Sequence, residues 1–135
     1  MATLKTVYLG DLRTKASHIL SGNEITTDAP LDNHGKGEAF SPTDLAATSL
    51  ASCMMTVMGI EAKKLKVELS GLSSETTKIM SKDLPRRIVE IHVKFVFPAN
   101  EIKQEDFVQL KKVALECPVA LSLHPNIKQL VDFGF

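Results

Sequence analysis

The sequence predicts an α+β fold in a single domain over residues 1–135. Three observations support it: short strand-like segments come first, one long apolar helix follows, and an alternating strand pattern lies beyond that helix. Composition agrees, with 44% hydrophobic residues, 16 Lys+Arg and 16 Asp+Glu. A chain of this length buries roughly two thirds of its unfolded surface, so a core can form without disulfides or a structural metal.

The N-terminal part predicts a small antiparallel meander. Turn-forming groups, Gly10-Asp11 and Ser21-Gly22-Asn23, separate three strand-like segments: Leu4–Leu9, Lys15–Leu20 and Glu24–Asp28. The next segment, Ala29–Phe40, is rich in Gly, Pro, Asp and Asn, which predicts a loop able to cover a site. Its Gly35-Lys36-Gly37 lacks the flanking residues of a phosphate-binding loop.

The central segment predicts a buried helix that continues to about Lys64. Ser41 is placed to cap it, Pro42 suits the first helical position, and Asp44 completes a capping box. No charge falls from Leu45 to Ile60. These residues would rise only about 24 Å as a helix, whereas a membrane span needs about 20 apolar residues. Interspersed Ser, Thr and Gly also favour packing inside protein.

Beyond this helix the patterns predict a long hairpin, two helices and a last strand. Lys66–Leu69 alternates as a strand does, Gly71 marks a bulge or bend, and the strand continues at Glu75–Met80. Further strands are predicted at Val89–Phe97 and Gln129–Phe135, with helices at Gln104–Glu116 and from Pro118. The strand Val89–Phe97 is apolar at alternate positions, as in a half-buried antiparallel strand. Cys117 continues the apolar stripe of the Gln104–Glu116 helix.

Charge and aromatic content exclude several classes of function. A formal net charge of zero lacks the Lys and Arg surplus of a nucleic-acid clamp. Six Phe, one Tyr and no Trp argue against a stacking surface for bases or sugars. Polar and charged residues run through the first twenty positions, so we expect no signal peptide, a cytoplasmic protein and no membrane partner.

Two cysteines, Cys53 and Cys117, admit four interpretations. They can be independent small core residues, a structural disulfide, metal ligands, or a redox pair in which one thiolate attacks and the other thiol resolves. The four His show no metal-ligand spacing with them. Cys53 lies in the charge-free helix, where reactivity would need a nearby cation, and Cys117 lies at a helix junction.

The candidate cation is Arg13, in the expected turn from Gly10 to Thr14. A guanidinium stays charged when dehydrated and donates paired hydrogen bonds, for example to a thiolate and a peroxide oxygen. A solvated arginine in a surface turn is the alternative interpretation.

Three segments form a recognisable pattern. The first contains Cys53 and reads Phe40-Ser41-Pro42-Thr43-Asp44-Leu45-Ala46-Ala47-Thr48-Ser49-Leu50-Ala51-Ser52-Cys53. The second, Cys117-Pro118-Val119, begins 64 residues after Cys53. Together with Gly10-Asp11-Leu12-Arg13, this pattern resembles the OsmC/Ohr family of bacterial osmotically induced and organic-hydroperoxide-resistance proteins, and is nearer the OsmC-like branch. The resemblance covers essentially the whole chain.

The resemblance implies an intertwined α+β homodimer with its active sites at the subunit interface. It implies a thiol peroxidase that reduces organic hydroperoxides, with Cys53 peroxidatic, Cys117 resolving and Arg13 stabilising the thiolate. An external dithiol would be the electron donor, and no cofactor or metal is expected.

The sequence departs from the family pattern at the helix start. Peroxidase members commonly carry a Glu after the Pro, paired with the Arg, but here Thr43 takes that position and Asp44 follows. Ten residues of helix rise about 15 Å, so neither residue can touch Cys53 of the same helix, and such contact would come from a partner subunit. Thr43 and Asp44 are therefore possible accessory residues.

Two other functions remain open at this point. One is a non-peroxidatic protein of the same fold that binds a small apolar ligand under the Ala29–Phe40 loop, at the dimer interface. The other is a structural or interaction protein whose two thiols are simply buried.

Overall fold

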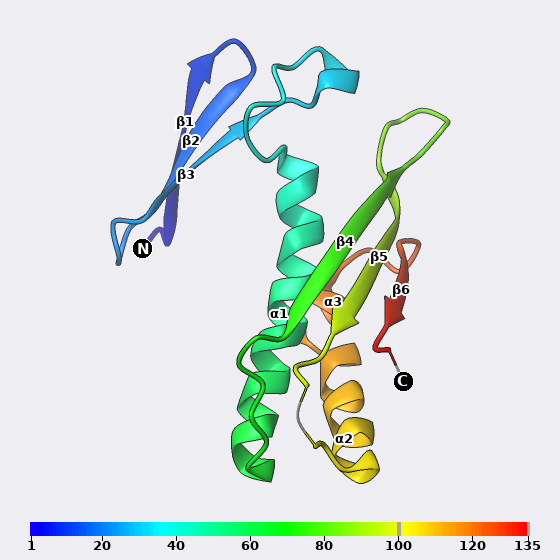
Figure 1. Cartoon of the computed structure of the whole chain (residues 1–135). Helices are drawn as coiled ribbons and strands as arrows, with labels where there is room; N and C mark the ends of the chain where they lie inside the picture. The colour runs from blue at the N-terminus through cyan, green and yellow to red at the C-terminus, as the bar shows by residue number, and fades with distance from the viewer. Residues whose placement is uncertain (100, 135) are drawn as a thin grey trace. The chain divides into compact units, whose positions relative to one another are not determined.

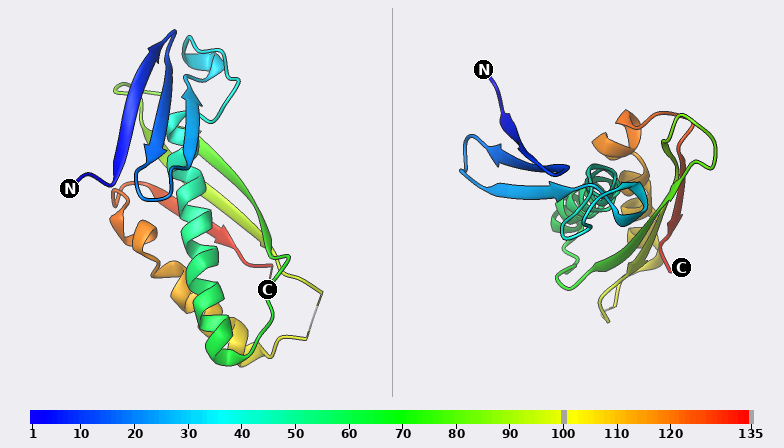
Figure 2. Two further views of the ribbon diagram at one scale, coloured as in Figure 1. Left: turned by 90° about the vertical axis from the view of Figure 1, so that its left-hand side faces the viewer. Right: turned by 90° about the horizontal axis from the view of Figure 1, so that it is seen from above.

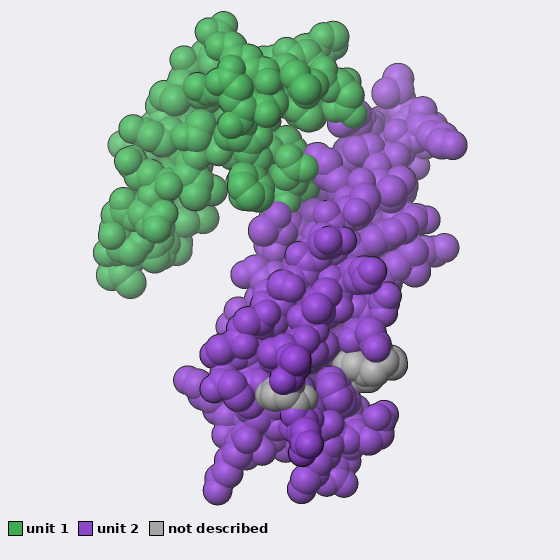
Figure 3. Space-filling model, in the orientation of Figure 1, with its two compact units in different colours: residues 1–46 green, residues 47–135 purple. Residues whose placement is uncertain are grey.

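The computed structural model describes residues 1–99 and 101–134 and confirms the α+β fold (Figure 1). The elements are β1 (Leu4–Gly10), β2 (Arg13–His18), β3 (Glu24–Asp28), the 3₁₀ turn η1 (Leu31–Asn33), α1 (Pro42–Leu65), β4 (Ser73–Met80), β5 (Ile88–Val96), α2 (Gln104–Leu115), α3 (Pro118–Ser122) and β6 (Lys128–Asp132). The chain divides into two compact units, Met1–Ala46 and Ala47–Phe135 (Figure 3). Each is described by itself below.

The N-terminal unit contains the predicted antiparallel meander, in the order β1-β2-β3. Its second strand was misplaced by two residues, since it begins at Arg13 and ends at His18. The reason is the turn that precedes it. Asp11 and Leu12 both adopt positive φ, 52° and 63°, which makes a tight two-residue reversal. Arg13 therefore lies in the sheet, opposite Asp28, and not in the turn as predicted.

The loop after β3 is held together by its own backbone. Gly35 donates to the carbonyl of Pro30 and Gly37 to that of Ala29, while Asp28 donates to the carbonyl of Phe40. Gly35 is required, because a Cβ there would lie 1.7 Å from the Ala29 oxygen. The two ends of the loop are thus tied together and present Glu38 in a defined place.

The predicted capping box of α1 is confirmed. The Asp44 N–H donates to Ser41 Oγ at 3.0 Å, and the Ser41 N–H donates to Asp44 Oδ2 at 2.9 Å. Within the described residues α1 is the one helix long and apolar enough to cross a membrane by length and composition, a test that core helices also pass. Here α1 contributes six buried residues to the core: Ala47, Leu50, Ala51, Met54, Met58 and Ala62.

No strand forms at Lys66–Leu69, which corrects the prediction. The helix end uses these residues instead: Lys66 adopts a positive φ of 58°, and the Val67 N–H donates to the Ala62 carbonyl at 2.8 Å. Such a left-handed closure satisfies the last helical carbonyls. Its usual residue is Gly, so Lys66 gave no sequence signal.

The C-terminal unit has a second three-stranded sheet, β4-β5-β6, with α1 and α2 on one of its faces (Figures 1 and 2). β4 and β5 form the predicted antiparallel hairpin, whereas β6 pairs with β5 in parallel. The last strand covers Lys128–Asp132 and ends earlier than predicted, since Phe133 and Gly134 are not part of it; Phe135 lies outside the described residues.

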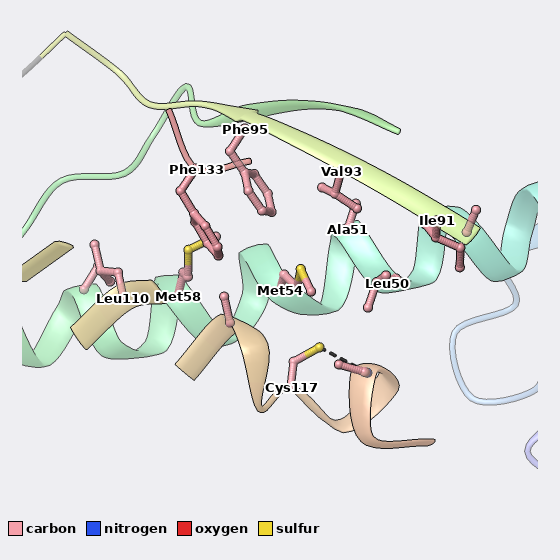
Figure 4. Close-up of a cluster of buried hydrophobic side chains, with 14 residues drawn as sticks. Leu50, Ala51, Met54, Met58, Ile91, Val93, Phe95, Leu110, Cys117 and Phe133 are labelled. Carbon is pink, nitrogen blue, oxygen red and sulfur yellow. Dashed lines mark hydrogen bonds between the residues drawn. The ribbon is translucent and has the colours of Figure 1, made fainter. Parts of the chain in front are cut away.

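The hydrophobic core lies in this second unit (Figure 4). Alternate residues of β5, Ile91, Val93 and Phe95, face the apolar stripe of α1. Leu110 and Ala114 of α2 complete the packing, both with no exposed surface. The 3.6-residue and two-residue periodicities seen in the sequence are therefore the ones that build the core.

Candidate redox site and arginine cluster

The two cysteines are in contact. Cys53 lies on α1 and is half-buried, Cys117 directly precedes α3 and is fully buried, and both thiols are free. Cys53 packs against the core cluster that contains Cys117, close enough to raise the pKa of the Cys117 thiol. The packing of α1 against the α2–α3 segment thus brings together two thiols that are 64 residues apart in the sequence.

Local structure fixes the Cys117 side chain. α2 ends at Leu115, and Pro118 forces the preceding residue into extended backbone, which Cys117 adopts with φ −65° and ψ 151°. Its Sγ then accepts a hydrogen bond from the Ala120 N–H at 3.4 Å, shown dashed in Figure 4. Cys117 is the N-terminal cap of α3, so its sulfur cannot turn away without releasing that bond.

The surroundings of Cys117 favour its protonated form. Burial raises the pKa of the Cys117 thiol, and the hydrogen bond and negative charge of Cys53 raise it further, whereas the N–H groups of Ala120 and Val119 oppose the rise. The raised pKa keeps Cys117 in its protonated, less nucleophilic form. Cys53 is the more accessible of the two thiols and is therefore the better placed to attack.

Arg13 belongs to a cluster in the N-terminal unit. Its Nε donates to Asp28 Oδ1 at 2.7 Å and its Nη2 to Asp28 Oδ2 at 2.9 Å, a two-pronged ion pair. Nη2 also donates to Glu38 Oε2 at 3.0 Å. The Glu38 N–H donates to Asp28 Oδ2 at 3.1 Å, which closes the cluster.

The charges in this cluster stabilise one another. The hydrogen bond from Arg13 lowers the pKa of Asp28, against the opposing effect of burial. The same bond, followed by that of Glu38, raises the pKa of Arg13. Asp28 is therefore ionised at neutral pH although it is only 1% exposed.

Sequence reasoning missed Asp28 and Glu38. A signal existed for Asp28, since an acidic residue at the end of the third strand lies opposite Arg13 if the register is known. Of the possible accessory residues, Asp44 is engaged in the capping box and Thr43 Oγ1 lies 3.2 Å from Ser41 Oγ. The carboxylates on Arg13 are thus Asp28 and Glu38.

Residues 1–99 and 101–134 contain no group of three or more His, Cys, Asp or Glu side chains that could hold a metal ion. The candidate reactive groups are therefore the two thiols and the Arg13 guanidinium, which two carboxylates hold.

An α+β fold with two contacting thiols on facing segments defines a candidate thiol redox protein. A family model described as OsmC-like protein matches residues 35–130. The chain belongs to this OsmC-like family, which confirms the resemblance seen in the sequence.

Solved structures agree with this assignment. A putative osmotic stress induced and detoxification response protein from Psychrobacter arcticus is 52% identical, with a TM-score of 0.92, and the match covers 98% of this chain and 95% of that one. An organic hydroperoxide resistance protein OsmC from Legionella pneumophila is 17% identical, with a TM-score of 0.74 and coverage of 98% and 96%.

A putative organic hydroperoxide resistance protein from Vibrio cholerae, with captopril bound in one of its active sites, is 19% identical. Its TM-score is 0.74, and the match covers 98% of this chain and 91% of that one. At such identities the likeness shows the fold alone. No curated protein sequence matches this chain.

Proposed function

We propose that this protein is a thiol-dependent peroxidase that reduces organic hydroperoxides in the cytoplasm. The observation that carries the proposal is the packing of a half-buried Cys53 beside a fully buried Cys117, whose pKa is raised by that burial, in an OsmC-like fold. Two relatives of the same fold are described as organic hydroperoxide resistance proteins. Independent core cysteines would not require this asymmetry between the two thiols.

The proposed reaction has three steps. The Cys53 thiolate attacks the distal oxygen of the hydroperoxide, the O–O bond breaks, and the alkoxide takes a proton to leave as the alcohol, while Cys53 becomes a sulfenic acid. The Cys117 sulfur then displaces the sulfenic hydroxyl, which leaves as water with the thiol proton, and a disulfide forms. An external dithiol reduces that disulfide by exchange and is itself oxidised.

Arg13 is assigned the role of the cation that stabilises the Cys53 thiolate and polarises the peroxide. This assignment rests on the family resemblance of the segment Gly10 to Arg13. Guanidinium suits the task because it keeps its charge and donates from several nitrogens in one plane. Under this proposal Thr43 and Asp44 take no part in the chemistry, because both belong to the helix start.

We also propose that the protein works as a homodimer. The N-terminal unit, all of whose residues are described, buries no hydrophobic side chain, yet it exposes eleven large ones: Met1, Leu4, Val7, Tyr8, Leu9, Leu12, Ile19, Leu20, Ile25, Leu31 and Phe40. Surfaces of this kind usually mark an interaction site. A second copy of the chain is the occupant that the family resemblance implies.

A stoichiometric titration tests the peroxidase proposal. One equivalent of tert-butyl hydroperoxide should consume both thiols and yield a Cys53–Cys117 disulfide, detected by thiol counting and peptide mass spectrometry. Cys53→Ser should leave the peroxide untouched, whereas Cys117→Ser should accumulate a sulfenic acid at Cys53. Thiol counts that stay unchanged in the wild type would reject the peroxidase and leave the alternative, binding of a small apolar ligand.

A further inference from the structure

We infer that Asp28 and Glu38 are positioning residues for Arg13 and so serve, in this chain, the purpose of the Glu that is missing at Thr43. The inference rests on the proposed function, because it concerns the residue assigned to stabilise the Cys53 thiolate. Neither carboxylate touches the reacting atoms under this inference; both act by fixing the direction in which Arg13 donates.

The argument begins with the donors of the guanidinium. Arginine has five N–H groups, and three of the hydrogen bonds described above use the Nε and Nη2 groups. Within residues 1–99 and 101–134, Nη1 donates to no protein atom. The Arg13 side chain as a whole remains 32% exposed, and under this inference Nη1 is the nitrogen that donates to the thiolate or to a ligand. The carboxylates thus leave one nitrogen, with both of its N–H groups, for the reaction.

Asp28 is the fixed member of the cluster. It is almost fully buried and accepts three N–H bonds, two from Arg13 and one from the Glu38 backbone. Its backbone is equally constrained, since Asp28 pairs with Arg13 in the sheet and donates to the carbonyl of Phe40. A two-pronged bond to such an anchor restricts both rotation and translation of the guanidinium.

Glu38 is the second, weaker member and connects the cluster to the loop. Its side chain is 64% exposed, so its ion pair contributes little energy by itself. However, its backbone N–H donates to Asp28 while its carboxylate accepts from Arg13. The place of Glu38 depends on the closed loop and therefore on Gly35. The loop conformation and the direction of Arg13 are linked through this residue.

Asp28 could act on the Cys53 thiolate through its negative charge or by positioning Arg13, and these two roles predict opposite effects when Asp28 is neutralised. If Asp28 acted only through its negative charge, removing that charge would strengthen the positive field of Arg13 and favour the thiolate. If Asp28 positions Arg13, the guanidinium moves when the two-pronged bond is lost, and the thiolate is disfavoured. The sign of the change in Cys53 reactivity therefore separates the two roles.

The test compares Asp28→Asn and Glu38→Gln with Glu24→Gln, a matched control. Glu24 lies on the same strand as Asp28 and pairs with Lys15, not with Arg13. Two quantities are measured: the rate of reaction with tert-butyl hydroperoxide, and the pH dependence of Cys53 alkylation by iodoacetamide, followed by mass spectrometry. The second readout needs no peroxidase activity.

We expect Asp28→Asn to lower both rates about 10- to 100-fold, since small displacements of a catalytic group have effects of this order. Glu38→Gln should lower them roughly 2- to 5-fold, in keeping with an exposed pair. Alkylation of Cys53 should need a higher pH in both variants, and Glu24→Gln should behave as the wild type. A shift to lower pH, or an Asp28→Asn variant that matches Glu24→Gln, would overturn the inference.

A double-mutant cycle with Arg13→Lys separates positioning from general structural damage. Lysine keeps the charge and loses the planar fork, so neither carboxylate variant should reduce the rates further in the Arg13→Lys background. Undiminished effects there would contradict the inference, as would an Arg13→Lys protein that reacts like the wild type. If Asp28→Asn fails to fold, as judged by circular dichroism, the Glu38→Gln cycle decides.

The two proposals can fail separately. A wild-type protein that does not react with hydroperoxide rejects the peroxidase. The alkylation cycle still supports the positioning role if Asp28→Asn and Arg13→Lys shift the Cys53 profile together, and it rejects that role if they do not.

Discussion

The two units of this chain are stabilised by different means. Among residues 1–99 and 101–134, all fourteen buried hydrophobic residues lie in the second unit, whereas the buried residues of Met1–Ala46 are Thr27, Asp28 and Ser41. The second unit has an ordinary core between helices and a sheet. The first is a meander and a loop held by backbone hydrogen bonds and one ionic cluster. The two thiols therefore lie in the unit with the hydrophobic core, and Arg13 lies in the unit held by hydrogen bonds and ion pairs.

The largest expected difference between the units is in the cost of removing an apolar side chain. Leu110→Ala deletes a side chain with no exposed surface and should lower the free energy of unfolding by about 2–5 kcal/mol. Leu9→Ala, at 54% exposure in the N-terminal unit, should cost less than about 1 kcal/mol at low protein concentration. Urea denaturation measures both. Equal losses would show that the first unit has a core of its own.

If the protein dimerises through the N-terminal unit, the stability losses of Leu110→Ala and Leu9→Ala should become more similar as the protein concentration rises. If a second copy covers the meander, each tenfold dilution should lower the apparent free energy of unfolding by about 1.4 kcal/mol. Ile25→Glu places a charge on the sheet face shared with Ala16, its register partner, and should shift the protein to monomer. Sedimentation velocity reads the state directly. A wild type that is monomeric at all concentrations would contradict the proposed assembly.

Two aspartates of the N-terminal unit should respond differently. Asp44→Ala removes half of the capping box of α1 and should lower stability by about 1 kcal/mol. The hydroperoxide rate should stay within about twofold of the wild type, because Asp44 bonds to Ser41 at the helix start and not to Arg13. Asp28→Asn should instead change the rate. Thermal unfolding and peroxide kinetics on both variants give the comparison, and a large rate loss in Asp44→Ala would return that residue to the site.

The smallest expected effect is on acid stability. The pKa of Asp28 is lowered in the folded protein by Arg13, so the unfolded chain takes up the proton first. The contribution of this pair is therefore complete above the ordinary value of 3.8 and is lost as pH falls through the lower folded pKa. Asp28→Asn should flatten the stability curve below pH about 4. Because Arg13 is one third exposed, solvent screens the pair and keeps the difference small. Parallel acid curves for the two proteins would contradict this prediction.

Much of the fold could be read from short-range patterns. The capping box at Ser41, the helix break at Pro118 and the alternation along β5 each depend on residues within a few positions of one another. Failures came where local signals were absent or misleading. Lys66 takes a left-handed conformation that usually calls for Gly, and the turn at Asp11-Leu12 advanced β2 by two residues. The parallel pairing of β6 had no local signal at all.

For the candidate site, too, some features could be predicted from short stretches of sequence and others could not. The identity of Cys53, Cys117 and Arg13 followed from residue type and motif, and family membership then agreed with it. Their roles remain proposals. The partners of Arg13 could not be found without the register of β2 and β3, since Asp28 and Glu38 lie 15 and 25 residues away along the chain.

The helices, most strands and the three candidate site residues could be found from the sequence alone, because propensity, capping and side-chain type act over a few neighbouring residues. Tertiary structure decided which thiol is buried and has a raised pKa, that the two thiols lie together, and which carboxylates hold Arg13. These properties depend on distance and burial across strands and helices far apart in the chain. Electrostatic and hydrogen-bond energies follow that geometry and not the order of the residues.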